Sequence, residues 1–313
     1  MNQTASSWRD LPRRILTVAI GVPSIILLLQ HPVTSWLFFQ GAHLICLFEW
    51  RTLVPPSSSA AGSKREGDAP LLSLYSIFVF SIASFLITIT STSLLPLVLM
   101  GSSVILRLLP HLPTCQQVTS KQSSENIILT IQHYQFGLLY ISIGFHYTLR
   151  IALGVRGTYH IGNLLFVVWM SDTGALICGR MMKSTTIQQR QAVGKGSQEG
   201  FFVEFLRSIS PGKTIYGLIG AIVTGPISAI LYPMMFAPTD DEFLQVENTV
   251  TQKACLGFIL AIAGIIGDLA ESSVKRLSAK KDSGKLLPGH GGIVDRFDSL
   301  LVSAVVYFYW IAS

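Results

Sequence analysis

Long apolar blocks separated by shorter polar stretches recur along the whole 313-residue chain. The blocks run for roughly 16 to 24 residues, about the length that a helix needs to cross a hydrocarbon core roughly 30 Å thick. We therefore expect an all-α fold, a polytopic transmembrane helical bundle of about nine spans. The predicted spans are residues 15–30, 34–54, 71–90, 93–110, 134–153, 159–181, 214–237, 254–274 and 298–313.

The composition supports a membrane protein. Half of the residues are hydrophobic and only 13% are charged, whereas soluble domains carry about 25% charged residues. The four cysteines form no CxxC pair, and three of them fall within apolar blocks. This usage favours buried small apolar side chains over a disulfide framework or a zinc site.

The placement of basic residues agrees with nine alternating spans. With that count, the N-terminus and the loops after spans two, four, six and eight share one side of the membrane, and they carry 20 of the 23 Lys and Arg residues. By the positive-inside rule that side is cytoplasmic. We therefore expect a multi-pass protein with its active site near the cytoplasmic face.

The chain is expected to divide near residue 153. Residues 1–153 would form the N-terminal transmembrane helices, spans one to five, and residues 154–313 the C-terminal catalytic region. Three polar stretches, 55–70, 111–127 and 184–200, are expected to be flexible linkers because of their composition.

The candidate chemistry begins with an acid inside the eighth span. Asp268 follows the apolar run ACLGFILAIAGIIG, and an acid at that depth is costly unless it pairs or faces a wet cavity. On a helix, Ser272 and Lys275 lie four and seven residues further on, on the same face as Asp268. One helix face therefore carries an acid, a hydroxyl and a cation.

A second acidic group follows the glycine-rich turn PGHGG at residues 288–292. Asp295 and Asp298 are three residues apart and share one face at the start of the last span. Carboxylates from two helices suit a hard cation such as Mg2+, and surrounding cations suggest a polyphosphate. Those cations are Lys275, Arg276, Lys280, Lys281, Lys285 and Arg296.

Plainer interpretations exist for part of this set. Lys280 and Lys285 equally suit a role at lipid headgroups on the cytoplasmic side. His290 alone fits a turn residue whose ring is satisfied by the backbone. Neither interpretation accounts for Asp268 and Asp295, because anions gain nothing from a headgroup surface.

Residues 272–298 resemble the signature of the phosphatidate cytidylyltransferases, the CDP-diacylglycerol synthases. The segment reads SSVKRLSAKKDSGKLLPGHGGIVDRFD and fills each fixed position of that pattern. SDTGALICGR at 171–180 resembles a second family motif. SPGKTIYG at 210–217 resembles a third, with Gly212 and Tyr216 where lysine and glutamate are common. Over the first five spans only the hydropathy and Glu49 fit.

The resemblance implies that the protein makes CDP-diacylglycerol and pyrophosphate from CTP and phosphatidate, with Mg2+ required and a second cation open. It places the metal on Asp268 and Asp295. The catalytic set that we expect is Asp268, Asp295, Lys275, Arg276 and Asp298. The expected substrate-binding set is Asp172, Arg180, Ser210, Lys213, Thr214, Ser272, Lys281, Asp282, His290 and Arg296.

Alternatives from other classes remain at this stage. A CTP-dependent polyprenol or dolichol kinase has partly similar C-terminal motifs, and an ion transporter also carries charges within the membrane. A CDP-alcohol phosphotransferase would need a DGxxAR motif, which is absent. The expected partners are CTP, phosphatidate, the lipid bilayer and, by resemblance, a second copy of the chain, with no nucleic acid. The sequence leaves the acyl-chain preference and the host membrane open.

Overall fold

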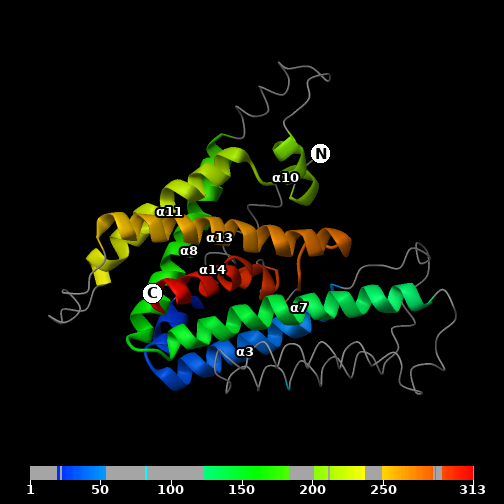
Figure 1. Ribbon diagram of the computed structural model, residues 1–313, viewed down its shortest axis with the longest axis horizontal. Coiled ribbons are helices and arrows are strands. Elements are labelled where there is room, and N and C mark those ends of the chain that lie inside the picture. The colour runs from blue at the N-terminus through cyan, green and yellow to red at the C-terminus, as the bar shows by residue number, and fades with distance from the viewer. Residues whose placement is uncertain are drawn as a thin grey trace, which may run out of the picture. The chain divides into compact units, whose positions relative to one another are not determined.

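A computed structural model describes residues 20–21, 23–53, 82, 123–182, 201–210, 212–236, 249–284, 286 and 291–312 (Figure 1). These residues form helices and no strand. The helices are α3 (Pro32–Arg51), α7 (Ser123–Ala152), α8 (Gly157–Met181), α10 (Phe201–Ile209), α11 (Ile215–Phe236), α13 (Val250–Leu277) and α14 (Val294–Ala312).

The all-α prediction is confirmed for the described part of the chain: residues 20–21 and 23–29 of the predicted span 15–30 are helical, and six further predicted spans have a helix at their position. They are 34–54, 134–153, 159–181, 214–237, 254–274 and 298–313, which correspond to α3, α7, α8, α11, α13 and α14. The predicted spans 71–90 and 93–110 lie outside the described residues, apart from Ile82. Among the residues that were placed, α8, α11 and α13 are long and apolar enough to cross a membrane.

Two details of the prediction were wrong. The stretch 111–127 was expected to be a linker, but its last five residues belong to α7, which begins at Ser123. The polar composition of residues 123–127 gave no indication that the helix extends beyond the apolar block. The short helix α10 was not predicted either, since nine residues are too few for a periodic pattern to stand out.

The chain separates into two compact units. Unit 1 comprises Met1–Leu153 and Val274–Phe297, and unit 2 comprises Gly154–Ser273 and Asp298–Ser313. The boundary therefore falls within α13 and within α14. Most of the predicted signature at 272–298 belongs to unit 1, together with the N-terminal helices.

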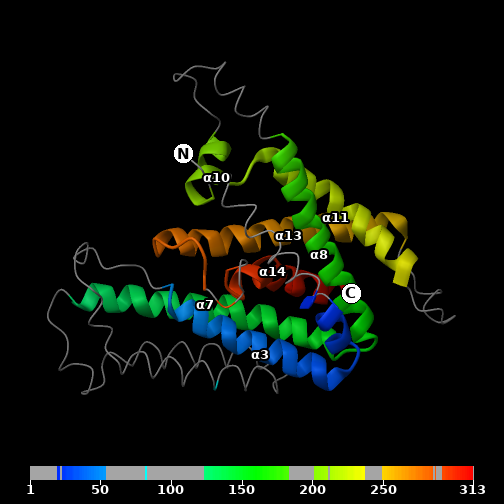
Figure 2. The same cartoon turned by 180° about the vertical axis from the view of Figure 1, so that it is seen from behind.

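In unit 1, α3 and α7 run side by side, as both views show (Figure 2). Trp50 of α3 is fully buried. Its Nε1 donates to the carbonyl of His133 over 3.0 Å, and Nε2 of His133 lies 2.9 Å from the carbonyl of Trp50. Gly137 of α7 lies against the indole, where a Cβ would come within 2.7 Å of Cε2. The indole therefore fills a space that only glycine leaves open on α7.

Unit 2 depends on small residues that let its helices approach closely. Gly217 of α11 lies against α8, where an added Cβ would be 3.0 Å from the carbonyl oxygen of Ala175. Gly257 of α13 lies against α11, where a Cβ would be 2.7 Å from Cα of Pro226. Close packing through small side chains is the main source of helix association where the surroundings are as apolar as the core.

The α11–α13 crossing gives the first testable prediction. Gly257→Ala is expected to lower the free energy of unfolding by about 1–3 kcal/mol, because the new methyl group meets backbone that cannot move aside. Gly264→Ala, on the same helix, is the matched control, since its Cβ would be 3.5 Å from Cβ of Ser299, an ordinary contact. Thermal melting in detergent should show a lower midpoint for Gly257→Ala alone. Equal midpoints for both variants would contradict this packing.

Candidate active site

Unit 2 contains a cavity of about 490 Å³ between α8, α11 and α13. Its wall is mostly apolar, from residues such as Val168, Leu218 and Leu260. Its polar lining is Ser171, Asp172, Arg180, Lys213, Thr214 and Asp268. Five of these six residues belong to the predicted site, and they come from three separate stretches of the sequence. The structure therefore brings these five together.

The N-terminus of α11 opens onto this cavity. Thr214 immediately precedes the helix, and its hydroxyl oxygen accepts a hydrogen bond from the amide of Gly217 over 3.1 Å. Lys213 and Thr214 both line the cavity, as does Arg180 at the last turn of α8. Because a helix N-terminus carries unsatisfied amides and a partial positive charge, this end of the cavity suits an anion.

Asp268 supplies the opposite charge in the same cavity. Its Oδ2 forms an ion pair with Nζ of Lys213 over 2.8 Å, and the two side chains are 35% and 19% exposed respectively. The hydroxyl of Ser272, one turn further along α13, donates to Oδ1 of Asp268 over 3.2 Å. The expected i, i+4 pairing of these two residues is therefore present.

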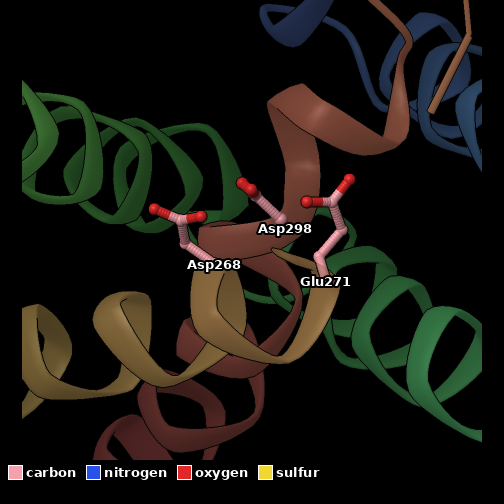
Figure 3. A group of neighbouring side chains, drawn as sticks. All are labelled: Asp268, Glu271 and Asp298. Carbon is pink, nitrogen blue, oxygen red and sulfur yellow. The ribbon is translucent and has the colours of Figure 1, made fainter. Parts of the chain in front are cut away.

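Asp268 also belongs to an acidic cluster with Glu271 and Asp298 (Figure 3). The first two side chains come from α13 and the third from α14, and one carboxylate oxygen of each lies within 4.8 Å of the others. Glu271 and Asp298 are buried. Such a set of oxygen donors fits the preference of a hard divalent cation such as Mg2+.

A glycine makes this cluster sterically feasible. Gly267 lies directly against the backbone of α14, where a Cβ would be 3.1 Å from the carbonyl carbon of Asp298. Any larger residue would push α14 away from α13. The residue next to Asp268 therefore decides how near Asp298 lies to it.

Asp295 belongs to unit 1 and is held by several donors. Its Oδ1 accepts from Nζ of Lys275 over 2.7 Å, with the two side chains 8% and 14% exposed. Its Oδ2 accepts from the amide and the hydroxyl of Ser283, each over 3.0 Å, and from the amide of Gly292 over 2.8 Å. The preceding Gly291 has a positive φ of 81°, which explains why a glycine is needed in this turn.

The other predicted residues fall as follows. Arg276, Lys281, Asp282 and Arg296 are exposed. Ser210 is partly exposed and precedes the cavity residues, its carbonyl accepting from the amide of Lys213 over 3.1 Å. His290 lies outside the described residues, as does Lys285. Since Asp268 belongs to unit 2 and Asp295 to unit 1, a joint metal site of these two residues stays a prediction.

Three residues with notable positions had no assigned role from the sequence. Glu271 and Asp268 are three residues apart in the sequence, a spacing that signals one helix face. Ser171 is buried at the cavity wall, and its hydroxyl oxygen has no hydrogen-bond partner among the described residues. Glu49 contacts the segment around Asp295, which no local pattern in the sequence could indicate.

These features define a class of protein: an integral membrane protein built from apolar helices, with paired acids and cations lining a cavity between three of them. Comparison with known families gives a narrower assignment. The model of the cytidylyltransferase family matches residues 12–313. The chain belongs to the cytidylyltransferase family.

Individual relatives agree with this assignment. A phosphatidate cytidylyltransferase of Staphylococcus haemolyticus (strain JCSC1435) is 38% identical over 162 residues, which is 52% of this chain and 52% of the relative. A protein of the same name from Bacillus subtilis (strain 168) is 33% identical over 172 residues, 54% of each chain. The uncharacterized protein YnbB of Escherichia coli (strain K12) is 43% identical over 103 residues, 33% of this chain and 32% of the relative. The matches to the two named enzymes span about half of their length.

Proposed function

We propose that this protein is a phosphatidate cytidylyltransferase, which transfers CMP from CTP to phosphatidate and releases pyrophosphate. The observation that carries the proposal is the cavity that gathers Asp172, Arg180, Lys213, Thr214 and Asp268. The names of the Staphylococcus and Bacillus relatives support it. An apolar wall beside a charged end suits a substrate that is itself a charged headgroup on a lipid.

This reaction does not need a strong general base. A phosphate monoester has a second pKa near 6, so the phosphatidate phosphate is largely ionised at neutral pH. One of its oxygens forms a bond to the α-phosphorus of CTP, and the bond from that phosphorus to the oxygen shared with the β-phosphorus breaks, so that pyrophosphate leaves with that oxygen. The protein must bring two polyanions together and stabilise the leaving pyrophosphate, which is mainly a matter of positioning and charge.

The residues of the cavity fit these tasks. We assign phosphate binding in unit 2 to Lys213, Arg180 and the N-terminus of α11, all of which line the cavity. In unit 1 the corresponding cation is Lys275, next to Asp295. From the family resemblance we assign Asp268 and Asp295 to Mg2+, and Glu271 and Asp298 would be further oxygen donors near Asp268. Bound Mg2+ would neutralise charge on the triphosphate and on the departing pyrophosphate.

The proposal includes a topology. We place nine spans in the membrane, with the signature residues 272–298 on the cytoplasmic side, because 20 of the 23 basic residues then share that side. We also include a homodimer, which the family resemblance implies. The particle mass in detergent tests the dimer, and cysteine labelling of inside-out vesicles tests the topology.

An assay with labelled nucleotide tests the activity itself. Purified protein with phosphatidate and α-labelled CTP is expected to yield labelled lipid, whereas γ-labelled CTP should yield labelled pyrophosphate and no labelled lipid. EDTA should abolish the transfer and Mg2+ should restore it. Label in the lipid from γ-labelled CTP would instead identify a lipid kinase and overturn the proposal.

A further inference from the structure

Glu49, near the end of α3, contacts the two segments that flank the signature turn. Its Oε2 accepts a hydrogen bond from the amide of Val294, the first residue of α14, over 3.0 Å. The same oxygen accepts from the hydroxyl of Ser283 over 3.2 Å. All three residues belong to unit 1. A single carboxylate oxygen thus ties together the residues before and after the turn.

Ser283 connects this carboxylate to Asp295. Its hydroxyl lies 3.2 Å from Oε2 of Glu49 and 3.0 Å from Oδ2 of Asp295, and its amide donates to the same Oδ2 over 3.0 Å. Ser283 is 2% exposed. A hydroxyl has one proton to donate, so Ser283 shares it between the two carboxylates, and its oxygen lies within hydrogen-bond distance of both.

The side chain of Glu49 occupies space that two glycines leave open because they lack a Cβ. A Cβ on Gly284 would overlap Oε1 of Glu49 and come within 2.8 Å of Cδ. A Cβ on Gly292 would meet Oε2, but it would also lie 2.6 Å from the backbone nitrogen of Gly284. The carboxyl group therefore fills a gap that two backbone segments leave open, and its position is fixed by packing as well as by hydrogen bonds.

We infer that Glu49 is a positioning residue for the CMP transfer proposed above: it holds Ser283 and Val294 so that the carboxylate of Asp295 keeps one orientation for the metal. The inference rests on the proposed function. Glu49 itself touches neither substrate nor metal in this account. It acts because the orientation of a metal-binding carboxylate is set by the groups hydrogen-bonded around it.

Three substitutions separate positioning from charge. Glu49→Ala removes both hydrogen bonds. Glu49→Asp keeps the negative charge but withdraws it from Val294 and Ser283, because the side chain is one methylene shorter. Glu49→Gln keeps an oxygen that can accept both bonds, and the amide nitrogen replaces Oε1, which has no hydrogen-bond partner among the described residues.

The expected result is that Glu49→Gln resembles the wild type, while Glu49→Ala and Glu49→Asp need about ten times more Mg2+ for half-maximal CMP transfer. The Mg2+-dependent rise in melting temperature, measured without substrates, should shrink in the same two variants. Glu204→Ala, which removes an exposed carboxylate from α10, should change neither measurement. The melting measurement does not depend on activity, so it tests Glu49 even if the wild type transfers no CMP, a result that would reject the proposed function alone.

A double-variant comparison adds a second test. Gly284→Ala is expected to impair transfer in the wild type and to cost much less in the Glu49→Ala background, since the overlapping atoms are then absent. Gly292→Ala should not be relieved in this way, because its conflict is with the backbone of Gly284.

The inference is overturned if Glu49→Asp matches the wild type while Glu49→Gln is impaired, since the negative charge of residue 49, and not its hydrogen bonds, would then determine the Mg2+ requirement. It is equally overturned if Glu49→Ala lowers stability but leaves the Mg2+ requirement unchanged.

Discussion

Asp295→Asn is expected to lower CMP transfer by a factor on the order of 10³, the scale seen when one preorganised electrostatic contact is lost at a reacting centre. The aspartate accepts from Lys275, from the amide and hydroxyl of Ser283 and from Gly292. An asparagine has one oxygen in place of two and presents N–H groups to at least one of these donors. It also removes the negative charge that a metal would need. The measurement is the initial rate with saturating CTP and Mg2+.

The matched control for this variant is Glu204→Gln, which neutralises an exposed carboxylate on α10. It should transfer CMP at the wild-type rate. Both proteins are expected to reach the membrane at similar levels, because one buried ion pair is a small part of the packing of unit 1. If Asp295→Asn keeps a substantial part of the wild-type rate, the assignment of this residue to the metal is wrong.

Lys213→Met is expected to lower kcat/KM for CTP by about 10²-fold. Loss of this cation removes the positive charge that we propose to bind phosphate at the N-terminus of α11, and charge-assisted contacts to phosphate are among the stronger hydrogen bonds in proteins. The variant also leaves Asp268 without the ion pair that it forms over 2.8 Å. A bound metal can compensate Asp268, so the Mg2+ concentration for half-maximal activity should not rise. This separates Lys213 from Glu49, whose loss should raise that concentration.

Lys253→Met provides the comparison for this variant, because Lys253 lies in the first turn of α13, far along that helix from Asp268. It should leave kcat/KM for CTP unchanged. An equal loss in both variants would point to a general effect of net charge rather than to a contact in the cavity. A large rise in the Mg2+ requirement of Lys213→Met would show that the lysine supports the metal site instead of the nucleotide.

The sequence predicted the helices well because helix formation in a membrane is governed by local composition. A run such as ACLGFILAIAGIIG has one low-energy backbone in hydrocarbon, and α13 contains it. The same local logic predicted that Ser272 would share a face with Asp268. It failed where a helix continued into polar residues, as α7 does before its apolar block.

The candidate site was predictable to the extent that its residues carried a recognisable pattern. Asp172, Arg180, Lys213, Thr214 and Asp268 lie in segments that resemble family motifs, and the structure places all five around one cavity. The ion pair of Lys213 with Asp268 was not predicted, because neither segment contains a pattern that indicates contact with the other. The role of Thr214 at the start of α11 was likewise missed, because the sequence suggested a ligand rather than a helix cap.

The sequence by itself determined which of the described segments are helical and which acids and cations are candidates for chemistry, whereas the side of the membrane that carries the basic residues stays a prediction. These properties follow from neighbours along the chain, where periodicity and composition are informative. Only the tertiary structure decided that Gly267 lets Asp298 approach Asp268, and that Glu49 reaches Ser283 and Val294 more than 230 residues away. Contacts of that kind depend on where helices cross, and the crossing point is set by the fit of small side chains between helices, which no single segment encodes.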